Sequence, residues 1–338
     1  MVETKWVVLI AVAIAVTGCT KKEAPAPAAE EKAAVEQEKP AEPVEPILPL
    51  PDKADVNMDK VMLGRSLYFD TALSGDGTIS CATCHSLDHG GAEPRKTSTG
   101  IGGQVGPINS PTVLNSSYNF VQFWDGRAKD LQEQAAGPVE NPMEMGAKWD
   151  NVVKRLGKNA EYVAAFAKLY DDGITKNNAT DAIAEYEKSL ITPSRFDAFL
   201  NGDDAAITEA EKQGYATFKE VGCTACHSGI IAGGAMFQKM GLVADYFKDR
   251  GTAITDADLG RYNVTKKEQD KHFFKVPTLR NVELTSPYLH DGSQASLEEV
   301  VKVMGKYQLG RELSDAQING IVTFLKSLTG KLPPHARP

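Results

Sequence analysis

The sequence predicts an all-α protein with two domains, and three observations support this fold class. Apolar residues recur at helical spacing in segments 151–156, 160–170 and 180–190. Further helices are introduced by N-terminal capping signatures, which are Thr208-x-x-Glu211, Ser296-x-x-Glu299 and Ser314-x-x-Gln317. Two cysteine motifs of one form begin 142 residues apart (223 − 81), an interval that fits one motif in each domain.

The N-terminus, residues 1–18, is typical of a signal peptide. Lys5 precedes an apolar run of 11 residues, 6–16, which is too short to span a bilayer as a mature helix. Val16-Thr17-Gly18-Cys19 then resembles a bacterial lipobox, which implies cleavage before Cys19 and lipidation of that cysteine. The alternative is an ordinary signal peptide cut nearby, with Cys19 incidental. Both predict export, and we expect a lipid-anchored protein on the periplasmic side of the cell envelope.

After Cys19, the chain up to residue 50 consists mainly of Ala, Pro, Glu and Lys, and we treat residues 19–50 as one region. Such a composition buries too little apolar surface to offset its ordering entropy, so we predict a disordered, extended tether. We place the N-terminal domain at 51–196, the C-terminal domain at 197–330 and a tail at 331–338. The net charge of −8 argues against a nucleic-acid partner and would suit a positively charged redox partner.

The two cysteine motifs are Cys81-Ala-Thr-Cys84-His85 and Cys223-Thr-Ala-Cys226-His227. C-x-x-C-H is the spacing of c-type haem attachment, in which both thiols form thioethers and the adjacent histidine ligates the iron. A single motif of this kind could arise by chance or bind zinc. Two in an exported chain, with no spare cysteine, favour two covalent haems.

The second axial ligand of each iron decides between electron transfer and peroxide chemistry. For the second haem the candidates are Met236, Met240 and Met304, and we favour Met304, which lies 77 residues after His227 (304 − 227). The alternative role for Met304 is core packing, the usual use of methionine.

The first haem has no obvious second ligand. The spare histidines are His89, His272, His290 and His335. His89 follows His85 by only four residues, and neither methionine nor histidine occurs between His89 and Met143. We therefore predict a first haem without a sixth protein ligand.

Several segments between 63 and 328 resemble the bacterial dihaem cytochrome c peroxidase family. These segments are Gly106-Pro-Ile-Asn-Ser-Pro-Thr-Val-Leu-Asn115, Phe123-Trp-Asp-Gly-Arg-Ala128, Asn141-Pro-Met-Glu-Met145, Val276-Pro-Thr-Leu-Arg-Asn281, Pro287-Tyr-Leu-His-Asp-Gly292 and Val303-Met-Gly305. The resemblance implies two cytochrome c-like haem domains packed together, with a Ca²⁺ ion at their junction. It also implies that the N-terminal haem reacts with peroxide and that the C-terminal haem, ligated by His227 and Met304, receives electrons.

The same resemblance implies roles for individual residues. Trp124 matches a tryptophan between the haems, although a buried core aromatic is the alternative. Asn109, Thr285 and Pro287 match calcium ligands, the last two through backbone carbonyls; oxygen ligands suit calcium. Glu144 matches a distal carboxylate that moves a proton between the peroxide oxygens, and Gln134 matches its polar neighbour.

One position departs from the family pattern. Many members carry a histidine in the loop before Gly-Pro-x-Asn that blocks the first haem until the other is reduced. Ile101 occupies that position, in the loop 97–104, and isoleucine cannot ligate iron. The resulting hypothesis is that the oxidised protein is active without reductive activation.

The predicted function is therefore reduction of hydrogen peroxide to water with electrons from a small periplasmic redox protein such as a c-type cytochrome. A homodimer is one assembly open to the chain. Two alternatives remain. A non-enzymatic dihaem relay would suit the tether, whereas a protein-oxidising maturation enzyme is disfavoured because such relatives carry tyrosine where Met304 stands.

Overall fold

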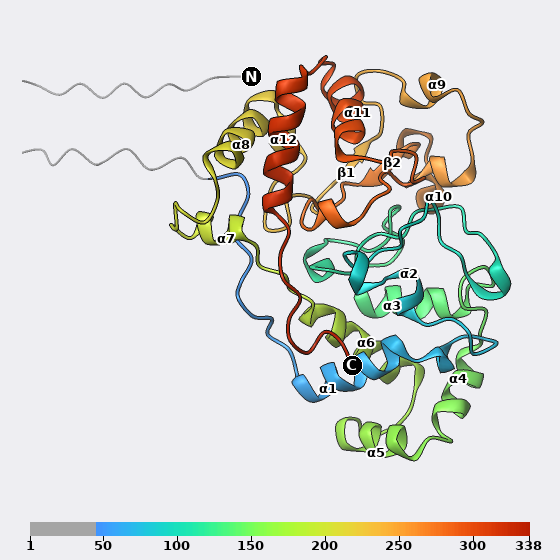
Figure 1. The fold of residues 1–338 in the computed structure, drawn as a ribbon. Coiled ribbons are helices and arrows are strands. Elements are labelled where there is room, and N and C mark those ends of the chain that lie inside the picture. The colour runs from blue at the N-terminus through green and yellow to red at the C-terminus, as the bar shows by residue number, and fades with distance from the viewer. Residues whose placement is uncertain (1–44) are drawn as a thin grey trace, which may run out of the picture. The chain divides into compact units, whose positions relative to one another are not determined.

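The computed structural model describes residues 45–338, which fold mainly into helices (Figure 1). The predicted signal peptide, the lipidation site at Cys19 and most of the predicted tether lie outside the described residues. The helical class is confirmed, with the addition of one small antiparallel sheet. Within residues 45–338, no helix is both long and apolar enough to cross a membrane.

The N-terminal half is built from six helices. They are α1 (Met58–Phe69), α2 (Cys81–Cys84), α3 (Leu131–Glu140), α4 (Trp149–Leu156), α5 (Ala160–Leu169) and α6 (Lys176–Ser189). The principal packing is α1 against α6, and α3 also packs against α6. Gly64 of α1 lies against the Ala182 carbonyl of α6, and a Cβ at position 64 would collide with it. Glycine therefore permits this close helix crossing.

The C-terminal half contains the remaining elements. They are α7 (Arg195–Leu200), α8 (Glu209–Val221), β1 (Phe237–Lys239), α9 (Tyr246–Arg250), α10 (Tyr262–Thr265), β2 (Phe273–Lys275), α11 (Leu297–Leu309) and α12 (Asp315–Ser327). The predicted capping boxes of α8, α11 and α12 are present in the structure. The two strands pair antiparallel, with Phe237 opposite Lys275.

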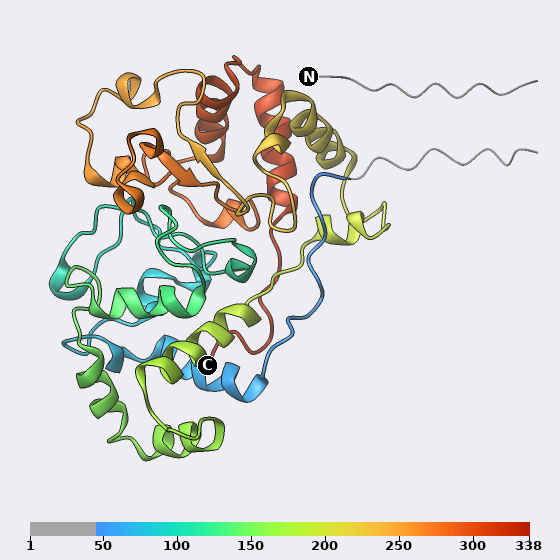
Figure 2. The ribbon, with the colours of Figure 1, turned by 180° about the vertical axis from the view of Figure 1, so that it is seen from behind.

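The two halves share one arrangement around their cysteine motifs. In each half the helix that precedes the motif crosses the last helix, α1 with α6 and α8 with α12 (Figures 1 and 2). Gly214 of α8 meets the backbone of Gly320 in α12, as Gly64 meets Ala182. Helix α8 ends at Gly222, which adopts φ 101° directly before Cys223. The first motif differs in this respect, because α1 ends at Phe69 and the motif cysteines themselves lie in α2.

The folded region begins before the predicted Pro51. In segment 45–50, the side chain of Ile47 is fully buried in the core of the C-terminal half, and that of Leu50 is also buried. The backbone of Ile47 pairs with Gly229, and the Tyr215 hydroxyl donates to Glu45 at 2.5 Å. The predicted tether is therefore too long at its C-terminal end, because Ile47 and Leu50 supply apolar surface that Ala, Pro and Glu lack.

The predicted tail, 331–338, is also packed. It runs back to the N-terminal half, where the chain ends beside α1 and α6 (Figure 1). Ala336 is buried there, and its carbonyl accepts a 2.5 Å hydrogen bond from the Tyr186 hydroxyl. Segment 45–50 and the tail thus each cross to the half of the molecule that is distant in sequence. The predicted boundary at 196 falls inside α7, whose Phe196 packs in the C-terminal core.

Candidate functional site

Two cavities enclose the cysteine motifs, one in each half of the molecule. The N-terminal cavity is lined by Cys81, Cys84 and His85, and the C-terminal cavity by the second motif. No disulfide bond joins the four motif cysteines. Burial raises the pKa of Cys81 and Cys84 to about 12.

The C-terminal cavity contains the motif residues together with a thioether. Cys223, Cys226 and His227 line it, and so do Met304 from α11 and Met240. Met236, the third candidate, is exposed and is not part of the lining. The structure therefore brings Met304 into the same cavity as His227, as the sequence predicted, and leaves Met240 as the alternative ligand.

Both motif histidines are oriented by the backbone. The Nδ1 atom of His85 lies 3.0 Å from the Pro111 carbonyl, and that of His227 lies 3.2 Å from the Ala232 carbonyl. Burial lowers the pKa of both imidazoles, that of His227 to about 4. Each ring is therefore neutral with Nδ1–H donating, and Nε2 is left for iron, the usual arrangement of a metal-ligating histidine. This arrangement fits haem c at both motifs.

The predicted distal residues line the N-terminal cavity together. Helix α3 is capped by Asp130 and carries Gln134 on its cavity-facing side, and Glu144 lies in the turn that follows the helix. The Asn141 amide donates to Glu144 Oε1 at 2.6 Å and fixes the carboxylate. Burial raises the pKa of Glu144, although Arg127 and the Asn141 hydrogen bond oppose that rise. A carboxyl group of raised pKa inside a cavity suits proton transfer.

Ile101 lies outside this cavity lining. Its backbone N–H donates to the Glu144 carbonyl at 2.7 Å, and its side chain packs where Gly75 and Gly146 leave room. At Gly100 a Cβ would collide with the Met143 carbonyl, so glycine allows the loop to lie directly on the turn that carries Glu144. The loop therefore supports the Glu144 turn and offers no iron ligand.

The four spare histidines are also accounted for. His89 is exposed and lines neither cavity, and His335 bonds to Ser189. His272 bonds through Nδ1 to the Asp258 carbonyl, and His290 through Nε2 to the Asp258 carboxylate. However, Met143 and Met145 do line the N-terminal cavity, and the sequence interpretation did not weigh them as ligands.

The wall between the cavities contains Trp124, as the resemblance implied. Its indole N–H donates to the Asn109 carbonyl at 2.9 Å, and its own carbonyl accepts from the backbone of Lys275 at 2.8 Å. Trp124, Asn109 and Lys275 each line both cavities. The tryptophan is thus held by backbone hydrogen bonds at the boundary of the two sites.

The three predicted calcium ligands lie around the C-terminal cavity. Asn109, Thr285 and Pro287 all belong to its lining. The Asn109 amide nitrogen donates to the carbonyls of Arg95 and Lys96, which leaves its Oδ1 available. Among residues 45–338, no hydrogen bond is accepted by the backbone carbonyls of Thr285 and Pro287. These oxygens fit the hard ligands that Ca²⁺ prefers.

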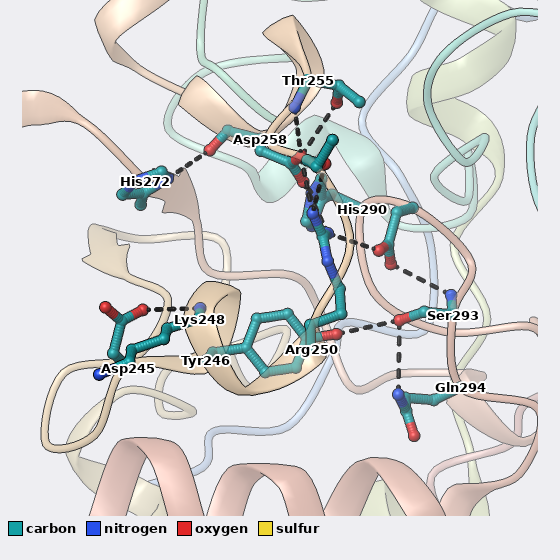
Figure 3. A network of polar contacts seen from close by, with 12 residues as sticks. Asp245, Tyr246, Lys248, Arg250, Thr255, Asp258, His272, His290, Ser293 and Gln294 are labelled. Carbon is teal, nitrogen blue, oxygen red and sulfur yellow. Dashed lines mark hydrogen bonds and ion pairs between the residues drawn. The ribbon is translucent and has the colours of Figure 1, made fainter.

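A buried polar network supports this wall from the C-terminal side (Figure 3). Ligand atoms of Asp258, His290 and Asp291 lie within 4.8 Å of one another. Arg250 already occupies the site, at 2.8 Å from Asp258 and 2.9 Å from Asp291. Burial alone would raise the pKa of Asp258, but the bonds from Arg250, Thr255 and His290 hold it well below its usual value.

The guanidinium of Arg250 therefore supplies the positive charge of this network. The carbonyl of His290 accepts from the Asn109 backbone at 2.8 Å, which connects the network to the wall. We interpret this cluster as structural support and not as a metal centre.

Two buried charged residues of the cavities were missed by the sequence interpretation. Glu187 of α6 lines the N-terminal cavity, and burial raises its pKa to about 8. Lys275 lines both cavities, and burial lowers its pKa to about 8. The only sequence signal for Lys275 is its place directly before Val276-Pro-Thr-Leu-Arg-Asn281, and we find no signal for Glu187.

Comparisons with known proteins agree with this geometry. Residues 58–205 match the family model described as di-haem cytochrome c peroxidase. The chain is 47% identical over 296 residues to a cytochrome c551 peroxidase of Nitrosomonas europaea, covering 87% of each chain. It is 51% identical to cytochrome c peroxidase Ccp of Escherichia coli over 86% of its own length, and spans 62% of that relative.

A solved structure is similar throughout. The crystal structure of a MauG-like protein associated with microbial copper homeostasis matches with a TM-score of 0.72 and 27% identity, over 85% of this chain and 94% of that one. At this coverage the match extends over both halves of the molecule. The chain therefore belongs to the di-haem cytochrome c peroxidase family.

Proposed function

We propose that the chain binds two haem c groups and reduces hydrogen peroxide to water at the N-terminal cavity. The observation that carries this proposal is the content of that cavity. It holds a C-x-x-C-H motif, a fixed carboxylate of raised pKa and a side-chain amide, and Ile101 leaves it without a histidine from the neighbouring loop.

Cys81, Cys84 and His85 would hold the first haem, and Cys223, Cys226 and His227 the second, with Met304 as the second protein ligand of the latter. When bound, the first haem supplies the iron that reacts with peroxide and the redox chemistry of O–O cleavage. The protein supplies the proton chemistry. Glu144 takes the proton from one peroxide oxygen and returns it to the other, which leaves as water.

Gln134 and Asn141 have different tasks in this scheme. The Asn141 amide holds Glu144 Oε1 at 2.6 Å and so keeps the carboxylate in one position. Gln134 offers an amide N–H to the oxygen on which negative charge develops. Two electrons and two protons per peroxide give two water molecules.

We propose that electrons come from a small c-type cytochrome and enter at the C-terminal site. Trp124 would couple the two sites, since it lines both cavities and is fixed by Asn109 and Lys275. Asn109, Thr285 and Pro287 would bind Ca²⁺ beside this wall. Lipidation at Cys19 and a position on the periplasmic side of the envelope complete the proposal, supported by the lipobox-like sequence.

We further propose that the oxidised protein is active without prior reduction. Ile101 packs outside the N-terminal cavity, and His89 is exposed away from it. Position 101 therefore holds no histidine that would have to leave the first haem before peroxide could bind.

Peroxide turnover of the purified holoprotein tests the function. We expect two covalent haems per chain and reduction of peroxide by a reduced c-type cytochrome, starting from the fully oxidised protein without a lag. Two haems with no peroxide consumption would contradict the proposal and favour the electron relay. Activity that appears only after pre-reduction would contradict the proposal that the oxidised protein is active, but not the proposed peroxidase function.

A further inference from the structure

Lys275 is a buried cation without a counter-charge. Only 7% of the residue is exposed. Among residues 45–338, neither a hydrogen bond nor an ion pair engages its ammonium group, and burial alone accounts for its lowered pKa. An unpaired ammonium in a protein interior is costly, so such groups normally face a ligand or a partner.

The position of Lys275 indicates what it faces. Seven residues line both cavities, namely Asn109–Thr112, Asn119, Trp124 and Lys275, and Lys275 is the one charged residue in this set. Its backbone is fixed by the hydrogen bond to the Trp124 carbonyl and by strand pairing with Phe237. The ammonium group is therefore built into the wall that separates the two haem sites.

Two other polar atoms on the cavity walls also lack a hydrogen-bond partner among residues 45–338. Asn119 Oδ1 and Ser116 Oγ are buried with no hydrogen-bond partner among the described residues. Asn119 lines both cavities and Ser116 lines the N-terminal one. A hydroxyl and an ammonium group are both suited to a carboxylate ligand, because each can donate a hydrogen bond to it, whereas Asn119 Oδ1 can only accept one.

We propose that Lys275 binds a propionate carboxylate of haem c and holds one positive charge between the two haem sites. The inference rests on the proposed binding of two haems and names a residue that the peroxide chemistry does not use. Haem carries two propionates, and each would otherwise be an anion in a mostly apolar cavity. The paired charge favours the reduced form of the haem to which it is bound, since it offsets the electron that arrives.

Charge removal at position 275 tests this pairing. We expect Lys275→Met to keep two covalent haems and to lower the reduction potential of at least one of them. The equilibrium constant for its reduction should fall about tenfold, which is about 59 mV for one electron. Lys275→Arg should retain the wild-type potential, because it keeps the charge. Lys239→Met, at an exposed lysine of the paired strand β1, is the matched control and should change neither potential.

The readings are potentiometric titration and the haem content per chain. If Lys275→Met does not attach both haems, the potentials and haem content of Lys275→Gln are measured in the same way. Potentials that equal those of the Lys239→Met control would overturn the inference, as would a holoprotein structure in which Nζ is more than about 4 Å from every propionate oxygen. Wild-type protein with two haems but no peroxidase activity would contradict the proposed function and leave this inference standing.

Discussion

At the scale of single residues, the chemistry depends on how each side chain is oriented by its neighbours. Asn141 fixes Glu144, and the backbone carbonyls of Pro111 and Ala232 orient His85 and His227. The motif residues could be predicted from the sequence because C-x-x-C-H spacing directly identifies the two cysteines that attach haem and the histidine that ligates its iron. Glu144 could be predicted only through resemblance, since nothing in its local sequence distinguishes it from other glutamates.

Glu144→Ala should retain both haems and lose about 10²- to 10⁴-fold in peroxidase turnover, the usual contribution of a general acid–base group. Steady-state peroxide reduction provides the measurement. Glu140→Ala, at the end of α3 and paired with the exposed Lys176, is the control and should stay near wild type. Turnover of Glu144→Ala close to that of the control would remove Glu144 from the mechanism.

Glu187 should make stability depend on pH. Burial raises its folded-state pKa from about 4.5 to about 8, so its favourable contribution is complete below the unfolded pKa and is lost as pH rises through about 8. Glu187→Gln, which stays neutral, should therefore match wild type near pH 4 and become progressively more stable than wild type towards pH 8.5.

Urea unfolding of the holoprotein at several pH values measures this difference. The control is Glu220→Gln, the same change at an exposed position of α8, which should leave the pH dependence as it is in wild type. A constant difference between Glu187→Gln and wild type across this range would show that the pKa of Glu187 is the same in the folded and unfolded protein, so that burial does not raise it.

At the scale of elements, the helices followed from apolar spacing and from capping boxes. The observed α4, α5 and α6 coincide closely with the segments predicted at 151–156, 160–170 and 180–190. The sheet of β1 and β2 was not predicted, because three-residue strands are too short to show an alternating pattern. Segment 45–50 was also missed, since its partners lie near residues 197 and 229, far along the chain.

This segment gives a prediction with an adjacent control. Ile47 is fully buried and Leu48, next to it, is 47% exposed. Ile47→Ala should lower the free energy of unfolding by about 2–5 kcal/mol, the usual cost of such a core truncation, whereas Leu48→Ala should cost much less. Chemical denaturation of the holoprotein measures both. Equal effects would mean that residues 45–50 are not part of the folded core.

At the scale of the whole molecule, the fold places two similar halves around one shared wall. The interval between the motifs predicted two halves, but not that segment 45–50 and the tail would each pack on the opposite half. Such crossings depend on long-range contacts that have no local pattern. The shared wall combines Trp124, Lys275 and Asn109, one of the predicted calcium ligands, so the two sites are expected to influence each other.

Removal of calcium should therefore affect the molecule as a whole. A chelator such as EGTA should lower peroxidase activity and the unfolding temperature, and added Ca²⁺ should restore both, because the ion would join Asn109 to the carbonyls of Thr285 and Pro287. Mg²⁺ should restore them less well, since it demands a stricter octahedral geometry. No change after exhaustive chelation would remove calcium from the account.

The central claim is that the iron held by His85 has no second ligand from the protein, whereas the iron held by His227 has Met304. Electron paramagnetic resonance of the fully oxidised holoprotein tests this most directly. We expect one high-spin or water-bound haem together with one low-spin haem, and a Met143→Leu variant with the same spectrum. Two low-spin haems, each with two protein ligands, would contradict it and would indicate a closed dihaem relay.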